Sequence, residues 1–129
     1  MQAPAINLVG GWLAMLAGVL SGSIAGLLFH DENWLGGYSS FRRRLARLGH
    51  ISFFGLGFVN LLFAATAGQL LLPPDYLKVA SAGLIVGVIA MPICCFLTAW
   101  RKPMRHLFPI PVLAVAIGIA AILAGWWRR

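Results

Sequence analysis

The sequence predicts an all-α integral membrane protein, a four-helix transmembrane bundle with both termini on the non-cytoplasmic side. Three observations predict this fold class: the composition, the long apolar runs and the placement of the basic residues. Of the 129 residues, 60% are hydrophobic and 10% are charged, and the mean hydropathy is +0.88. A soluble domain of this length cannot bury so much apolar surface, so lipid must replace water around most of the chain.

Four apolar runs are long enough to cross the roughly 30 Å of hydrocarbon in a bilayer, which takes about 20 helical residues. We expect one transmembrane domain over residues 1–129, with spans at about 8–29, 48–71, 77–100 and 108–127. Polar residues or prolines mark the ends of these runs. Asp31 and Glu32 follow the first run, and the last ends in Trp126 and Trp127 before two arginines, a usual anchor at a membrane interface.

The orientation follows from the basic residues in the short connections. The two loops that share one side of the membrane hold seven basic residues: Arg42, Arg43, Arg44, Arg47, Arg101, Lys102 and Arg105. The other side holds three: Lys78, Arg128 and Arg129. Because Lys and Arg are enriched in cytoplasmic loops, the first side is predicted to be cytoplasmic. A bacterial inner membrane is the expected location.

The formal net charge of +7 has two interpretations. Nucleic acid binding is not expected, since the bases lie beside the spans and are not interleaved with aromatic residues on a soluble face. Phe41, Leu45 and Leu48 recur at helical spacing, so the second helix should begin near Ser40 and carry its basic first turns along the headgroups. The arginines expected to contact anionic phospholipid are Arg42, Arg43, Arg44 and Arg47. A docking site for an acidic partner is the alternative.

The first span carries a stripe of small residues at every fourth position: Gly10, Ala14, Gly18, Gly22 and Gly26. Between helices in lipid, association depends on close van der Waals approach, which small residues at this spacing permit. Shorter versions occur on the third helix at Gly83 and Gly87, and on the fourth at Gly118, Ala121 and Gly125. These positions are predicted to pack helices within the bundle. The alternative is an interface with other membrane subunits or with a second copy of the chain.

All three histidines fall at the predicted cytoplasmic ends of spans. His30 closes the first span and continues its small-residue stripe, His50 lies just inside the second, and His106 opens the fourth. On the second helix, His50 shares an arc with Gly57 and Asn60, so His50 and Asn60 should point inward. Neutral imidazole suits haem iron, and bundle interiors commonly hold such cofactors, so His50, His30 and His106 are the candidate ligands of a haem b.

No span holds Asp, Glu, Lys or Arg in its central part, and no phosphate-binding loop, activated nucleophile or metal-ligand motif occurs. An enzyme is therefore not expected, and neither are catalytic residues or a metal site. The segment RLARLGHISFFGLGFVNLLF resembles the basic start and inward histidine of small membrane cytochromes and their assembly proteins. We expect a non-catalytic accessory or assembly subunit of a larger membrane complex, one with a respiratory or other redox role. The alternatives are a small membrane cytochrome and, third, a channel or transporter, for which Asn60, Thr66 and Ser81 are the main polar residues.

Overall fold

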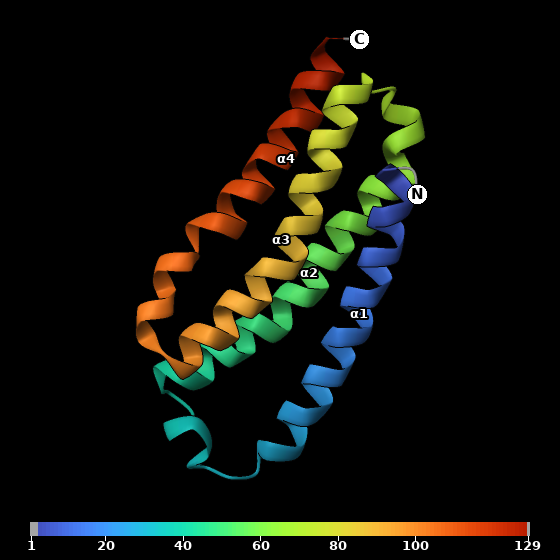
Figure 1. Ribbon diagram of the computed structural model, residues 1–129. Helices are drawn as coiled ribbons and strands as arrows, with labels where there is room; N and C mark the ends of the chain where they lie inside the picture. The colour runs from blue at the N-terminus through green and yellow to red at the C-terminus, as the bar shows by residue number, and fades with distance from the viewer. Residues whose placement is uncertain (1–2, 129) are drawn as a thin grey trace.

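The computed structural model describes residues 3–128, so Arg129, counted above among the basic residues, lies outside the described part. Within that part all the regular elements are helices (Figure 1). The elements are α1 (Ala3–Leu28), the short 3-10 helix η1 (Trp34–Gly36), α2 (Phe41–Leu70), α3 (Pro74–Trp100), the 3-10 helix η2 (Lys102–Leu107) and α4 (Pro109–Trp127). Each of the four α-helices is long and apolar enough to cross a membrane, which confirms the predicted helical class.

Local chemistry explains where the helices begin and end. The Ser40 side chain accepts a hydrogen bond from the backbone N–H of Arg43, which caps α2 and confirms a start near Ser40. Leu71 takes a left-handed conformation after α2. Two prolines follow, and Pro74 opens α3, where its missing N–H is not needed. The turn between α2 and α3 is therefore short and tightly defined.

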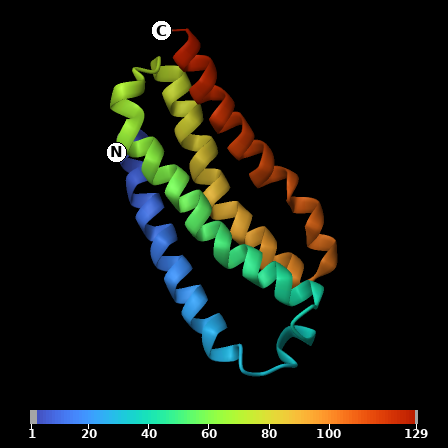
Figure 2. The same cartoon turned by 180° about the vertical axis from the view of Figure 1, so that it is seen from behind.

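α3 has the central position in the bundle, because it contacts each of the other three long helices. α1 packs on α2, α2 packs on α3, and α4 packs on α3 on the side away from α1 (Figures 1 and 2). α1 also touches α3, so the first three helices form a triangle in cross-section, and α4 packs on the outer side of α3. Both ends of the chain lie toward the same end of the molecule. Which side of a membrane that end faces stays a prediction.

Glycines bring α3 and α4 into close contact, as the sequence predicts for this pair. A side chain added at Gly83 would collide with the backbone of α4 at Ala114 and Gly118. In return, a Cβ at Gly118 would lie 3.2 Å from the carbonyl oxygen of Ala80. Because lipid supplies little hydrophobic drive between helices, this close backbone approach provides the packing energy of the α3/α4 pair.

Most of the outward surface is apolar. Leu27 is 74% exposed, Phe58 67% and Trp127 85%, and each lies on a different long helix or at its end. A protein in water does not leave apolar surface of this extent uncovered. Together with the four long apolar helices, these exposed side chains indicate an integral membrane protein.

Candidate functional site

Three buried polar residues join α1, α2 and α3 near the end of the bundle that holds the termini. Asn7 donates through Nδ2 to Oδ1 of Asn60 at 2.7 Å, and the Ser81 hydroxyl donates to Oδ1 of Asn7. Asn60 Nδ2 also donates to the carbonyl oxygen of Leu84 at 3.1 Å. Asn7 and Asn60 are fully buried, so their amides have no competing water. We call Asn7, Asn60 and Ser81 the polar lock. The inward position predicted for Asn60 is confirmed.

The small-residue stripe of α1 shows how the helix spacing changes away from the lock. Side chains added at Gly10, Gly18 and Gly22 would come within 2.7, 2.7 and 2.5 Å of Ile85, Phe54 and His50 respectively. Ala14 is buried in the same stripe. At Gly26, by contrast, a Cβ would meet no heavy atom of the described residues within 4 Å. α1 therefore separates from its neighbours beyond Gly22, as Figures 1 and 2 both show at the loop end.

His50 lies where this separation begins. Its Nδ1 is 3.1 Å from the Ser21 hydroxyl on α1, and its ring makes an edge contact with Phe54 at a centroid distance of 5.3 Å. The Ser21 hydroxyl also donates to the carbonyl oxygen of Gly18 at 3.1 Å. A hydroxyl has one proton, so both contacts form together only if His50 carries its proton on Nδ1 and donates to Ser21. In that tautomer Nε2 is a hydrogen-bond acceptor.

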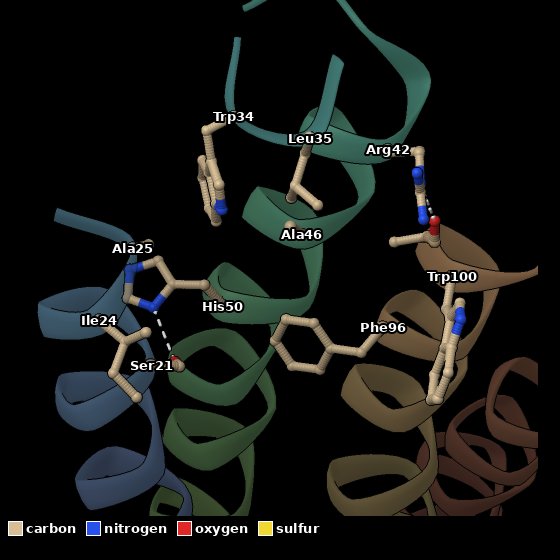
Figure 3. A pocket seen from close by; sticks show the side chains of 11 residues that line it. Ser21, Ile24, Ala25, Trp34, Leu35, Arg42, Ala46, His50, Phe96 and Trp100 are labelled. Atoms are coloured by element: carbon tan, nitrogen blue, oxygen red, sulfur yellow. Dashed lines mark hydrogen bonds between the residues drawn. The ribbon is translucent and has the colours of Figure 1, made fainter. Parts of the chain in front are cut away.

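A cavity of about 390 Å³ opens beside His50, between the loop ends of α1, α2 and α3 (Figure 3). It is lined by side chains from all three helices and from the loop that contains η1: Ser21, Ile24, Ala25, Trp34, Leu35, Arg42, Ala46, His50, Phe96, Ala99 and Trp100. We call this the His50 cavity. Figure 3 shows Nε2 on the ring edge turned toward Ala25, away from Ser21. The Trp34 indole extends from the loop toward the same space.

Arg43 holds the loop that forms the roof of the cavity. It is only 2% exposed, and its guanidinium donates to the carbonyl oxygens of Phe29 at 3.2 Å and Asp31 at 3.4 Å. The same group lies 4.6 Å from the ring centre of Phe29 and 5.4 Å from that of Trp34. Arg43 therefore lies inside the protein, where its planar donors satisfy loop carbonyls and its face contacts aromatic rings.

The other three arginines of the predicted headgroup set lie differently. Arg42 is exposed but donates through Nε to the carbonyl oxygen of Ala99 at 2.8 Å, which ties α2 to the end of α3. Arg47 lies over the ring of Tyr38, 4.7 Å from its centre. Arg44 is exposed to the surroundings. Headgroup contact stays a prediction, and the outward-facing members of the set that can make it are Arg42, Arg44 and Arg47.

The structure does not bring the three histidines to one site. The prediction that His30 continues the stripe is wrong, because α1 ends at Leu28 and His30 lies exposed in the following turn. His106 is exposed in η2, and only His50 lines the His50 cavity. In residues 3–128, no three His, Cys, Asp or Glu side chains gather where they could hold a metal ion.

Three residues of the site were not found from the sequence. Asn7 precedes the expected start of the first span, yet it lies three residues before Gly10 and thus on the same face. Ser21, whose hydroxyl contacts Nδ1 of the His50 ring, and Trp34, which lines the His50 cavity, were not among the predicted site residues. A search for polar residues on the small-residue face of the first helix would have found Asn7 and Ser21.

Comparisons with family models, with curated proteins and with solved structures find no match.

Proposed function

We propose that this protein is a non-catalytic accessory or assembly subunit of a larger membrane complex, embedded through its four long helices. The observation that carries the proposal is an uncovered stripe of small residues on α4. Ala116, Ala120 and Ala124 are exposed and stand four residues apart, so they form one line along the helix. The opposite face of α4, with Gly118, Ala121 and Gly125, is buried against α3.

An exposed line of alanines at this spacing has a specific use in lipid. Small residues let a neighbouring helix approach closely, and lipid chains fill such a shallow groove less well than a matched helix does. Beside this line, α3 and α4 border a hollow of about 570 Å³, lined in part by Tyr76 and Ala120. We infer that a helix of another membrane subunit packs along the alanine stripe and into this hollow.

The polar groups of the bundle favour a structural role over transport. The side chains of Asn60 and Ser81 form hydrogen bonds within the polar lock, and neither residue lines the cavities between α1 and α3. Thr66 donates to the carbonyl oxygen of Leu62 in its own helix. The acids of the sequence, Asp31, Glu32 and Asp75, lie outside the middle of the spans. A channel or transporter would use a continuous polar path through the bundle.

The proposed orientation places the loop end, with its basic residues, on the cytoplasmic side of a bacterial inner membrane. Arg44, Arg47 and Arg101 then lie at the level of anionic headgroups. In this orientation the α4 stripe is presented within the bilayer, where a partner helix can reach it.

Site-specific photocrosslinking in intact membranes tests the subunit proposal. A photoreactive residue at Ala120 should give a discrete crosslink to one protein, and the same residue at Ala65, exposed on α2, should not. Ala120→Leu should abolish that complex on a native gel while leaving the melting temperature of the purified chain unchanged. If Ala120→Leu and Ala65→Leu leave the native complex equally intact, the stripe is not the interface.

A haem-binding role is the second candidate, and one observation favours it. Histidine ligands of metals usually donate their second ring nitrogen to a fixed acceptor, and Ser21 gives His50 Nδ1 such a partner. Nε2 is then the nitrogen that could bind iron. The purified protein should show a Soret band that disappears in His50→Gln, whose amide cannot replace an imidazole on iron. A colourless protein that takes up no added haem removes this candidate.

A further inference from the structure

We propose that the face between α1 and α3 binds a membrane quinol, a dihydroxybenzene ring with an isoprenoid or alkyl tail. The ring occupies the His50 cavity, and the tail lies along the groove that continues from it toward the polar lock. This inference is independent of the subunit interface proposed on α4.

The shape of this face suits a molecule with a head and one long tail. A second hollow of about 450 Å³ lies between α1 and α3 over α2 and is lined by apolar residues: Ile6, Gly10, Leu13, Ala14, Ala17, Phe53, Ile85, Val88, Ile89 and Ile93. It lies beside the His50 cavity, toward the polar lock. The two linings come within about one helical turn of each other on α1 at Ala17 and Ser21, and on α2 at Phe53 and His50. From Ile6 to Ala25 the groove spans about 28 Å at 1.5 Å per residue.

The polar chemistry is confined to the loop end of this groove. His50 Nε2 has no hydrogen-bond partner among the described residues, and in the tautomer that allows both contacts of the Ser21 hydroxyl it is an acceptor. The indole N–H of Trp34 likewise has no partner within residues 3–128, and it is a donor only. A bound head group should therefore donate one hydrogen bond and accept another. A phenolic hydroxyl on each side of a ring does both.

The surroundings of these two groups favour a neutral ring over a phosphate. Phe96, Trp100 and Trp34 provide aromatic faces around the cavity. A phosphate diester has no proton to donate to Nε2, and its charge would have to be transferred into a mainly apolar enclosure. The nearest cation on the lining, Arg42, already uses Nε to bind the Ala99 carbonyl oxygen. A quinol matches both hydrogen-bonding groups without a charge.

The oxidised form of the same molecule provides the sharpest test. A quinone has carbonyl oxygens that accept from Trp34 but no hydroxyl to donate to His50. Binding of a radiolabelled decyl-benzoquinol and of the corresponding quinone should be compared by scintillation proximity, using full-length protein in phosphatidylcholine nanodiscs under argon. We expect the quinol to bind roughly fivefold more tightly, the value of about one neutral hydrogen bond. His50→Leu should remove that preference.

Matched substitutions locate the site. Ala25→Leu fills the His50 cavity and should weaken quinol binding at least tenfold, whereas Ala65→Leu, exposed on α2 and outside both hollows, should not change it. A photoreactive azidoquinol on the unaltered protein gives a readout that does not depend on the folding of a variant. Its label should fall on residues 17–34, 42–54 or 93–100, which line the His50 cavity or lie next to it.

Four results would overturn the proposal. The first is equal affinity for quinol and quinone in the unaltered protein, since Nε2 would then not accept from the ligand. The second is azidoquinol labelling confined to α4, and the third is equal weakening of quinol binding by Ala25→Leu and Ala65→Leu. The fourth is full displacement of the quinol by equimolar phosphatidylglycerol, which would identify the occupant of the groove as an anionic phospholipid.

Discussion

The side-chain amide of Asn7 donates to the side-chain oxygen of Asn60 at 2.7 Å, between two helices whose residues stand 53 positions apart in the chain. Both side chains are fully buried. In a bilayer no water can replace a lost partner, so this pair fixes the angle and the register at which α1 meets α2. Ser81 adds α3 to the same contact.

Asn60→Leu should therefore destabilise the bundle. The change removes the acceptor for Asn7 and the bond to the carbonyl oxygen of Leu84, so we expect the free energy of unfolding to fall by about 1–3 kcal/mol. Unfolding in mixed micelles of increasing SDS content measures this loss. Thr66→Val is the control, because its hydroxyl bonds only the carbonyl of Leu62 in the same helix. Equal stability of both variants would show that the lock contributes no net energy.

The basic run FRRR contains one arginine with a role that the others do not share. Arg43→Lys should loosen the loop over the His50 cavity, because one ammonium group cannot serve several carbonyls and stack on rings at the same time. Chymotrypsin should then cut faster after Trp34 or Tyr38. Arg44→Lys, at an exposed position, should leave the cleavage rate unchanged. Unaltered cleavage in Arg43→Lys would mean that the loop is held by other contacts.

Leucine substitutions along the small-residue stripe of α1 should differ in their effect on stability. Gly18→Leu and Gly22→Leu each place a side chain onto a ring of α2, and should lower the free energy of unfolding by about 1–3 kcal/mol or prevent assembly. Gly26→Leu carries the same change into open space and should be tolerated. Leu20→Ala, at an exposed position, should also cost little. Folding yield and thermal stability in detergent report the order. A stripe that faced lipid would tolerate all three leucines equally.

Orientation can be measured with single cysteines in a background of Cys94→Ala and Cys95→Ala. Both native cysteines are buried, so their thiols are not exposed in the folded protein. Ser39→Cys should be shielded from an impermeant thiol reagent in intact cells, and Gln69→Cys should react, because the basic loops are predicted to face the cytoplasm. Both positions are exposed at opposite ends of the bundle. The reverse labelling pattern would invert the topology.

The four long helices could be predicted from the sequence, because the length of an apolar run and the charges beside it are local properties. The start of α2 near Ser40 and the inward position of Asn60 followed from spacing alone. Charge counting could not separate Arg43 from Arg42 and Arg44, since its burial depends on how the loop folds back. The error at His30 has a similar origin. Helical register predicted a position on the stripe, but the chain leaves the helix two residues earlier.

The site needed tertiary information for a different reason. Nε2 of His50 is free because another residue, Ser21, occupies Nδ1. Ser21 lies 29 residues away on a different helix, so the sequence around His50 does not reveal this contact. The open space beside it results from the separation of α1 from α3, an angle between helices that no run of residues encodes locally. The indole of Trp34 enters this space only because the loop is held in place.

The polar lock defines the point about which α1 can tilt relative to α2 and α3. The helix is joined to both neighbours at Asn7, close to one end, whereas at Gly26, near its other end, a Cβ would meet no heavy atom of the described residues within 4 Å. A rotation of about 5° at the lock would move the far end, roughly 30 Å away at 1.5 Å per residue, by about 2–3 Å. The width of the His50 cavity therefore depends on the tilt of α1. The point about which α1 would tilt is the hydrogen bond between Asn7 and Asn60.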